Sequence, residues 1–247
     1  MTQWPDGNAG SATVPGMGLN IVVGFGDIDD EEGAEWFTAE VALANEVLRA
    51  AGQSGWTEPT DVVETDFELG GYSMLHTLRR LAAHLATSGE LPPPLDDSAE
   101  VGDDDVLAGL YREGPSHYAV VRKRLGHLRS SKRGSPRRGS FEHLTHHSDA
   151  EGLYAPVDFE PVVVSDLLIG GYIGSSHRLL AECLLLAEAL RLDPDLAPDS
   201  DEVMNALEGG VQDAAGWQRY GAESFVCLNL IGAARLSIAT GAAICFC

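Results

Sequence analysis

Residues 143–159, HLTHHSDAEGLYAPVDF, concentrate the side chains of this chain that could do chemistry. As a strand this stretch would place His143 and His147 on one face, and as a helix it would place them one turn apart. Either geometry brings two imidazoles within reach of one divalent metal ion, with Asp149 or Glu151 as a third ligand. The spacing matches no named zinc signature, so the metal site is one interpretation among several.

The same stretch contains the parts of a hydrolytic site, with Ser148 as nucleophile, a nearby histidine as base and Asp149 as the orienting group. Triads are assembled from distant parts of a chain, however, and adjacent turn residues rarely point at one another. The preferred interpretation is a hairpin with strands at 142–147 and 153–159. In it, Ser148 and Asp149 shape the turn at 148–152, and Glu151 faces solvent.

Two further motifs could bind an anion. In GGYIGSSHRLL, Ser175 and Ser176 stand at the expected start of a helix, where backbone N–H groups are exposed, and Arg178 adds positive charge. This motif lacks the lysine of a P-loop and the spacing of a dinucleotide fingerprint. The second motif is LHTLRRLAAHL, whose candidates for an acidic ligand are His76, Arg79 and Arg80. Pairing of these arginines with carboxylates of the same chain is the alternative.

Charge is the strongest global signal of the sequence. The 247 residues contain 38 acidic and 16 basic side chains, which gives a formal net charge of −22. Nine of the basic residues and one acid lie between Arg112 and Arg138, so that segment is +8 and the remainder is −30. Such a body repels nucleic acid and attracts basic proteins. We therefore expect a basic protein partner and no nucleic-acid ligand.

Hydrophobic periodicity predicts an α+β fold. We expect a small mixed or antiparallel sheet that includes a central hairpin and is covered on one side by four or five amphipathic helices, with the first and last strands pairing in its centre. Residues 62–71 carry no clear signal. The expected strands are 19–25, 142–147, 153–159 and 242–247, and the expected helices are 31–51, 72–87, 176–192, 200–207 and 214–240.

Composition divides the chain into one domain with appendages. Residues 1–16 are predicted to be a disordered extension, and residues 17–247 a single domain. Within that domain, 88–106 reads as an acidic linker and 112–138 as a basic flexible insertion. We find no apolar run long enough to span a membrane and no leader pattern, and the four cysteines lack C-x-x-C spacing. These features favour a cytoplasmic protein with reduced thiols.

Several stretches together resemble a family of uncharacterised bacterial proteins. The resemblance implies no activity, but it covers the chain from Met17 onward and agrees with a separate extension at 1–16 and an insertion at 112–138. The stretches that carry it are MGLNIVVG, EGAEWF, SMLHTLRRL, HLTHHSDAEGLYAPVDF, GGYIGSSHRLLAE and AARLSIATGAAICFC.

Two functions remain open on sequence alone. The first is a binding protein of immunity or toxin-neutralising type that engages a basic partner. The second is a hydrolase, metal-dependent or not, with a site around HLTHHSDAEG and the GSS helix start. No cofactor is predicted apart from the optional divalent metal. Convergence of the three motifs on one concave pocket would favour the enzyme.

Overall fold

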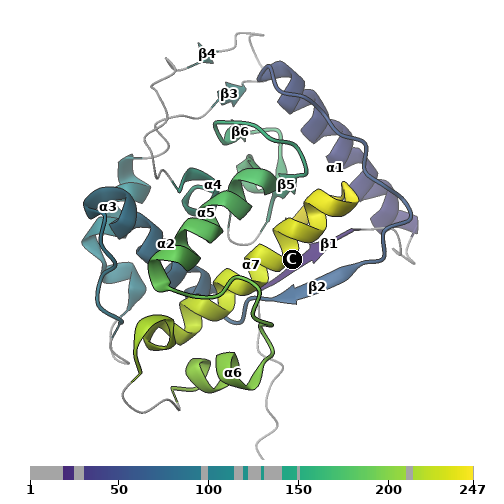
Figure 1. Ribbon diagram of the computed structural model, residues 1–247. Helices are drawn as coiled ribbons and strands as arrows, with labels where there is room; N and C mark the ends of the chain where they lie inside the picture. Colours follow the sequence, from purple (N-terminus) through teal and green to yellow (C-terminus); the bar gives the residue numbers. More distant parts are fainter. Residues whose placement is uncertain are drawn as a thin grey trace, which may run out of the picture.

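A mixed β-sheet with the strand order β2-β1-β8-β5-β7-β6-β3-β4 organises the fold (Figure 1). The structure, a computed structural model, describes residues 19–24, 31–95, 100–113, 119–121, 129–130, 141–148, 151–209 and 214–246. The predicted extension at 1–16, most of the predicted insertion at 112–138 and the candidate ligand Asp149 lie outside these residues.

The strands are short, and the first and last lie side by side in the sheet. β1 pairs antiparallel with β8, with Ile21 opposite Phe246 and Val23 opposite Ile244, so the pairing expected from the sequence is confirmed. The β5–β7 and β3–β6 pairs are parallel and the other pairs are antiparallel, which makes the sheet mixed. The strands are β1 (Asn20–Val23), β2 (Thr65–Glu68), β3 (Ala119–Val121), β4 (Arg129–Ser130), β5 (Leu153–Ala155), β6 (Val163–Ser165), β7 (Tyr172–Ser175) and β8 (Ile244–Phe246).

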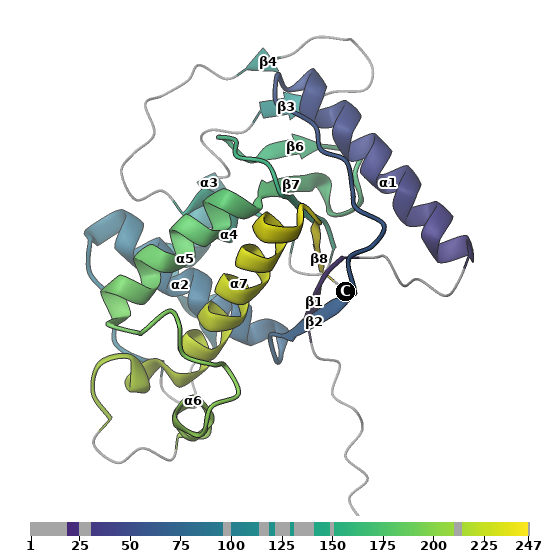
Figure 2. The same ribbon diagram turned by 45° about the vertical axis from the view of Figure 1, so that its right-hand side comes forward.

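The α+β class is confirmed, but helices cover both faces of the sheet, so the expectation of helices on one side is wrong. Helices α2, α5 and α7 lie on one face and α1 lies on the other (Figure 2). The described helices are α1 (Glu31–Ala50), α2 (Tyr72–Ser88), α3 (Asp105–Glu113), α4 (Glu142–Thr145), α5 (Ser176–Leu190), α6 (Asp201–Leu207) and α7 (Gly221–Thr240), with short 3-10 turns η1 (Val101–Asp103), η2 (Ile169–Gly171) and η3 (Gly216–Tyr220).

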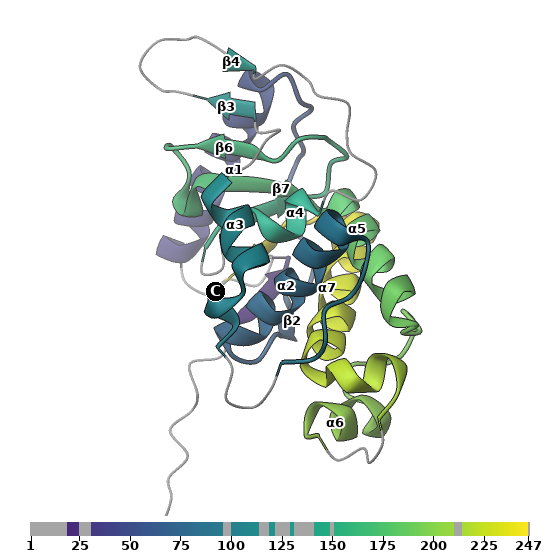
Figure 3. The same cartoon turned by 90° about the vertical axis from the view of Figure 1, so that its left-hand side faces the viewer.

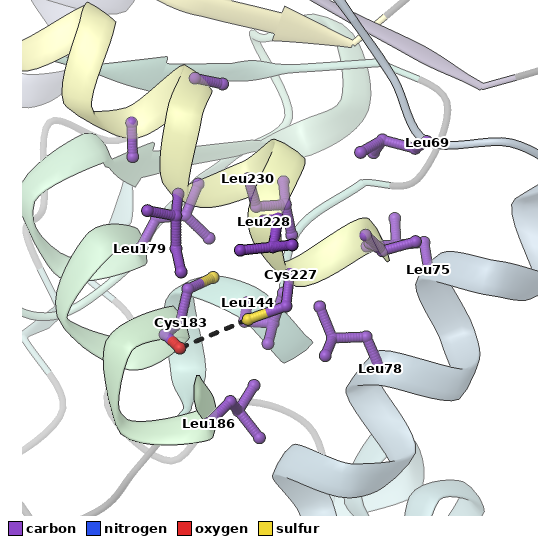
Figure 4. Close-up of a cluster of buried hydrophobic side chains, with 14 of the residues drawn as sticks. Leu69, Leu75, Leu78, Leu144, Leu179, Cys183, Leu186, Cys227, Leu228 and Leu230 are labelled. Atoms are coloured by element: carbon purple, nitrogen blue, oxygen red, sulfur yellow. Dashed lines mark hydrogen bonds between the residues drawn. The ribbon is translucent and has the colours of Figure 1, made fainter. Parts of the chain in front are cut away.

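The alternation of side chains along the strands divides the apolar core into two clusters. In β5, for example, Tyr154 packs with the helices α2, α5 and α7, whereas Leu153 and Ala155 point the other way toward α1. Figure 4 shows part of the larger cluster, where the thiol of Cys227 donates to the carbonyl of Cys183 at 3.4 Å. Both cysteines are free and buried.

Helix α7 is the central element of the larger cluster. Contrary to the expectation from the sequence, this helix together with η3 is long and apolar enough to cross a membrane by length and composition, and it is the one such helix among the residues described. However, 67% of its most apolar window is buried inside the protein. Its apolar surface therefore belongs to the core, against α2, α5 and α6 (Figure 3).

The predicted hairpin at 142–159 is wrong. Residues 142–145 form the short helix α4, and β5 pairs with β7 and β8 instead of with the histidine-rich stretch. The helix forms there because groups from α2 and α5, distant in sequence, satisfy its backbone at both ends. Those groups are described below.

Candidate functional site

The one-turn helix α4 is held between two buried, oppositely charged side chains. At its N-terminal end, the carboxylate of Glu182 on α5 accepts the amides of His143 (3.1 Å) and Leu144 (2.7 Å). At its C-terminal end, Arg79 on α2 donates to the carbonyls of Leu144 (2.8 Å) and His147 (2.9 Å). A negative charge at the N-terminus and a positive charge at the C-terminus both match the helix dipole. We call this arrangement the α4 clamp.

The strands β5 and β7 add two more contacts to α4. The hydroxyl of Tyr154 donates to the carbonyl of His143 at 2.7 Å, and the amide of Ser175 donates to Nδ1 of His143 at 2.9 Å. The ring of Tyr154 lies against Gly174, where a Cβ would overlap it, so this position of β7 requires glycine. The motifs of 143–159, 170–180 and 75–85 therefore meet at α4, where these buried groups form hydrogen bonds with one another.

His143 is a neutral, buried acceptor. Burial lowers its pKa to about 3, and electrostatic interactions with His147 and Arg178 lower it further. Because Nδ1 accepts the Ser175 amide, the ring proton is on Nε2, which is buried and has no hydrogen-bond partner among the described residues. The ring packs edge-on against Phe159, with centroids 5.7 Å apart.

His147 is also buried, with each ring nitrogen 3.0 Å from a carbonyl oxygen. Nδ1 faces the carbonyl of Ser148, and Nε2 faces the carbonyl of Leu153. The imidazole stacks on the ring of Tyr154 with centroids 3.9 Å apart. Both nitrogens are thus directed at protein acceptors.

The contact made by Ser148, which follows α4, agrees with the interpretation that this serine shapes a turn. The amide of Glu151 donates to the hydroxyl oxygen of Ser148 at 3.1 Å, and the Glu151 side chain is exposed. Among the described residues, no group of three or more histidine, cysteine or acidic side chains is placed to hold a metal ion. Asp149, the third member of the predicted metal set, lies outside those residues, so the predicted metal site stays a prediction.

The residues predicted to bind an anion at the start of α5 make protein contacts. The Ser175 hydroxyl donates to the carbonyl of Val157 (2.6 Å) and accepts the amide of Arg178 (3.3 Å), as an N-cap does. The hydroxyls of Ser176 and Ser237 lie 2.8 Å apart in the core. Arg178, partly exposed, forms ion pairs at the surface with Asp158 (2.7 Å) and Glu160 (2.6 Å).

The residues of α2 that were predicted to bind an acidic ligand lie in different environments. Arg80 pairs with Asp104 at 2.7 Å and also donates to the carbonyl of Pro93 at 3.1 Å. Asp104 additionally contacts His84, and its pKa is lowered to about 2 because amide, histidine and arginine hydrogen bonds outweigh its desolvation. His76 lies apart from this pair, with Nδ1 3.0 Å from the hydroxyl of Tyr111. Pairing within the chain thus accounts for Arg80.

A second candidate site, a set of exposed acidic side chains on the surface, was not predicted from the sequence. Residues 50–78, 81–111 and 192–218 contain no lysine or arginine, yet they carry half of the 38 acidic residues. In β2 and the loop before it the acids are exposed, and around α6 they are exposed as well. The signal was readable as alternation in the sequence ETDFE at 64–68. The exposed acids of the first and last of these stretches are Asp61, Glu64, Asp66, Glu68, Asp193, Asp195, Asp199, Asp201, Glu202 and Glu208.

We predict that Glu182→Ala destabilises the protein strongly. Burial raises the pKa of Glu182, against the two amide hydrogen bonds and the charge of Arg178 that lower it. Removing the carboxylate leaves two buried amides without an acceptor and one end of the clamp empty. We expect a loss of roughly 2–5 kcal/mol in the free energy of unfolding, measured by urea denaturation.

The matched control is Glu188→Ala, an exposed position on the same helix. It should change the free energy of unfolding by about 0.5 kcal/mol or less. Equal losses in the two variants would contradict the α4 clamp.

We also predict that His143 makes stability depend on pH. Its pKa is about 3 in the folded protein and near the ordinary 6.5 in the unfolded chain, so the unfolded chain binds the proton first. The contribution of His143 to the free energy of unfolding is complete above about pH 6.5. It declines as the pH falls toward 3, by at most ~1.4 kcal/mol per pH unit. His143→Asn keeps an acceptor for Ser175 but cannot titrate.

The measurement is the difference between wild type and His143→Asn in the free energy of unfolding from pH 7.5 to 4.5. The variant should lose stability less steeply than wild type as the pH falls. Parallel curves would show that the ring is not held neutral in the core.

Comparison with known proteins gives one positive finding. No curated protein matches the chain, and no solved structure matches it. A family model described as "Putative DNA-mimic protein" matches residues 17–246. The match begins at Met17, where the resemblance seen in the sequence also begins.

Proposed function

Because the chain belongs to the family described as "Putative DNA-mimic protein", we propose that it binds a basic DNA-binding protein in place of DNA. The surface that binds DNA on such a protein presents lysine and arginine to a regular array of phosphates. A protein that competes for this surface must present many exposed carboxylates without intervening cations. The net charge of −22 makes this chain suited to that role.

The observation that carries the proposal is the exposure of acids in stretches that lack basic residues. From 192 to 218 the described acids are all exposed, and one of them, Asp195, forms an ion pair with Arg235 at 2.8 Å. In 61–68 the exposed acids have no ion pair within the part of the chain that the structure describes. Within the described part of the chain, ion pairs therefore leave most of this negative charge available to a partner.

The acids that hold the buried part of the fold are a different set. Glu182 accepts the amide of His143 in α4, and Asp104 pairs with Arg80. Glu58 accepts the amide of Ala243 at 3.0 Å and the indole N–H of Trp56 at 2.6 Å. Each of these carboxylates is buried or half-buried. The division between inward acids that hold the fold and outward acids that face solvent supports a binding role for the latter.

The hydrolase alternative gains no support from the geometry. A serine nucleophile needs a base within hydrogen-bond reach, but the hydroxyls of Ser175 and Ser176 contact backbone groups or another serine. Toxin neutralisation is narrower than the family and stays a prediction, as does the cytoplasmic location. Each would follow from the identity of the partner.

We predict that the purified protein displaces DNA-binding proteins from DNA. A bacterial lysate is bound to DNA-cellulose at low salt and eluted with the protein, and the released proteins are identified by mass spectrometry. Release by the added protein should be efficient at about 50 mM salt and should fall steeply by about 200 mM. The reason is that a DNA-binding protein releases counterions both when it binds DNA and when it binds this acidic chain.

The control is a variant with exposed acids changed to their amides, which keeps shape and removes charge. It should release little. Release of nothing by wild type at low salt, or equal release by the variant, would contradict the proposed function. The positions changed are Asp61, Glu64, Asp66, Glu68, Glu90, Asp193, Asp199 and Glu208.

A further inference from the structure

Among the described residues, strand β2 ends the sheet and has one unpaired edge. It pairs with β1 alone, and no described residue forms a backbone hydrogen bond with its other edge (Figures 1 and 2). An unpaired edge offers a row of N–H and C=O groups to any extended chain that can approach it. The free edge of β2 is therefore a surface on which another strand can be added.

The register shows which residues present their backbone at this edge. The amide of Leu69 donates to the carbonyl of Leu19 at 2.9 Å, and in an antiparallel pair the hydrogen-bonded positions alternate. Phe67 and Thr65, opposite Ile21 and Val23, are then the positions bonded to β1. The backbone groups of Asp66 and Glu68 consequently point to the free edge.

The side chains of these same two residues are exposed on one face of the strand. Phe67 points the opposite way, against α7, where a Cβ on Gly232 would lie 2.9 Å from its ring. Successive outward side chains on a strand are about 6.6–6.8 Å apart, comparable to the distance between neighbouring phosphates of a nucleic-acid strand. Glu64 and Asp61, also exposed, extend the acidic row into the preceding loop.

Charge decides which chain this edge accepts. Residues 50–78 contain no lysine or arginine, so the edge lacks the cations that commonly protect edge strands. A second copy would place Asp66 and Glu68 against the same carboxylates, and like charges directly opposite are destabilising. An extended segment with lysine or arginine at alternate positions would place cations opposite both.

We propose that a basic, extended segment of the DNA-binding partner adds to β2 as a further strand of the sheet. Backbone hydrogen bonds to Asp66 and Glu68 supply affinity, and alternate cations against their carboxylates supply specificity. This inference rests on the proposed function and names the surface that carries it.

A labelled nine-residue peptide of alternating lysine and threonine tests the proposal with the whole protein at about 50 mM salt. Fluorescence anisotropy should show binding, and the backbone amides of Asp66 and Glu68 should become protected from hydrogen exchange in NMR. In the expected register, the lysines opposite the two acids direct their own N–H groups at β2. A peptide with Nα-methylated lysines keeps its charge but loses these donors, so it should bind much more weakly.

The matched variants have equal net charge. Asp66→Asn/Glu68→Gln should weaken peptide binding roughly tenfold, whereas Asp166→Asn/Glu188→Gln, at exposed positions outside the acidic stretches, should leave it nearly unchanged. Equal binding of the two peptides, or equal affinity of the two variants, would overturn strand addition at β2.

The DNA-cellulose experiment separates this inference from the function on which it rests. If Asp66→Asn/Glu68→Gln still displaces DNA-binding proteins as wild type does, the function stands and β2 is not its docking surface. If wild type displaces none, the proposed function fails, whatever the peptide shows.

Discussion

The fold depends on how the backbone N–H and C=O groups of α4, a single turn of helix, find hydrogen-bond partners in the core. A short helix has unpaired amides at one end and unpaired carbonyls at the other, and it has no length in which to form many bonds of its own. Here Glu182 accepts at the first end and Arg79 donates at the second. Since these side chains come from α5 and α2, the clamp also fixes those helices relative to the sheet.

The clamp explains why so many polar residues are buried around 143–182. Tyr154, Ser175 and His143 each complete a hydrogen bond that α4 or its neighbours would otherwise lack. Burial of charge is costly unless the charge is hydrogen-bonded, and both members of the clamp are. These side chains therefore hold the scaffold, and the acids that remain on the surface can serve recognition.

Much of the fold could be predicted from local sequence patterns. The long helices follow from apolar residues at helical spacing, and the pairing of β1 with β8 follows from short apolar runs at the two ends of the domain. The hairpin prediction was wrong because α4 is stabilised by residues distant in sequence. Arg79 is 65 residues from Leu144, and Glu182 is 39 residues from His143. No local pattern contains that information.

The candidate site was harder to predict than the fold. Histidine, serine and arginine have the same types and spacing whether they bind a ligand or a backbone group, and only the three-dimensional contacts separate the two roles. Strand β2 was missed because TDFE is polar, although its alternation with a period of two was present in the sequence. The partner class, in contrast, followed from net charge alone and agrees with the family.

The most direct test of the account takes one protein displaced from DNA and measures its affinity for this chain as a function of salt, with and without duplex DNA. A DNA mimic should show a steep linear fall of log affinity with log salt, as DNA does, and DNA should compete for the same site. An affinity indifferent to salt, or a ternary complex with DNA, would contradict the account.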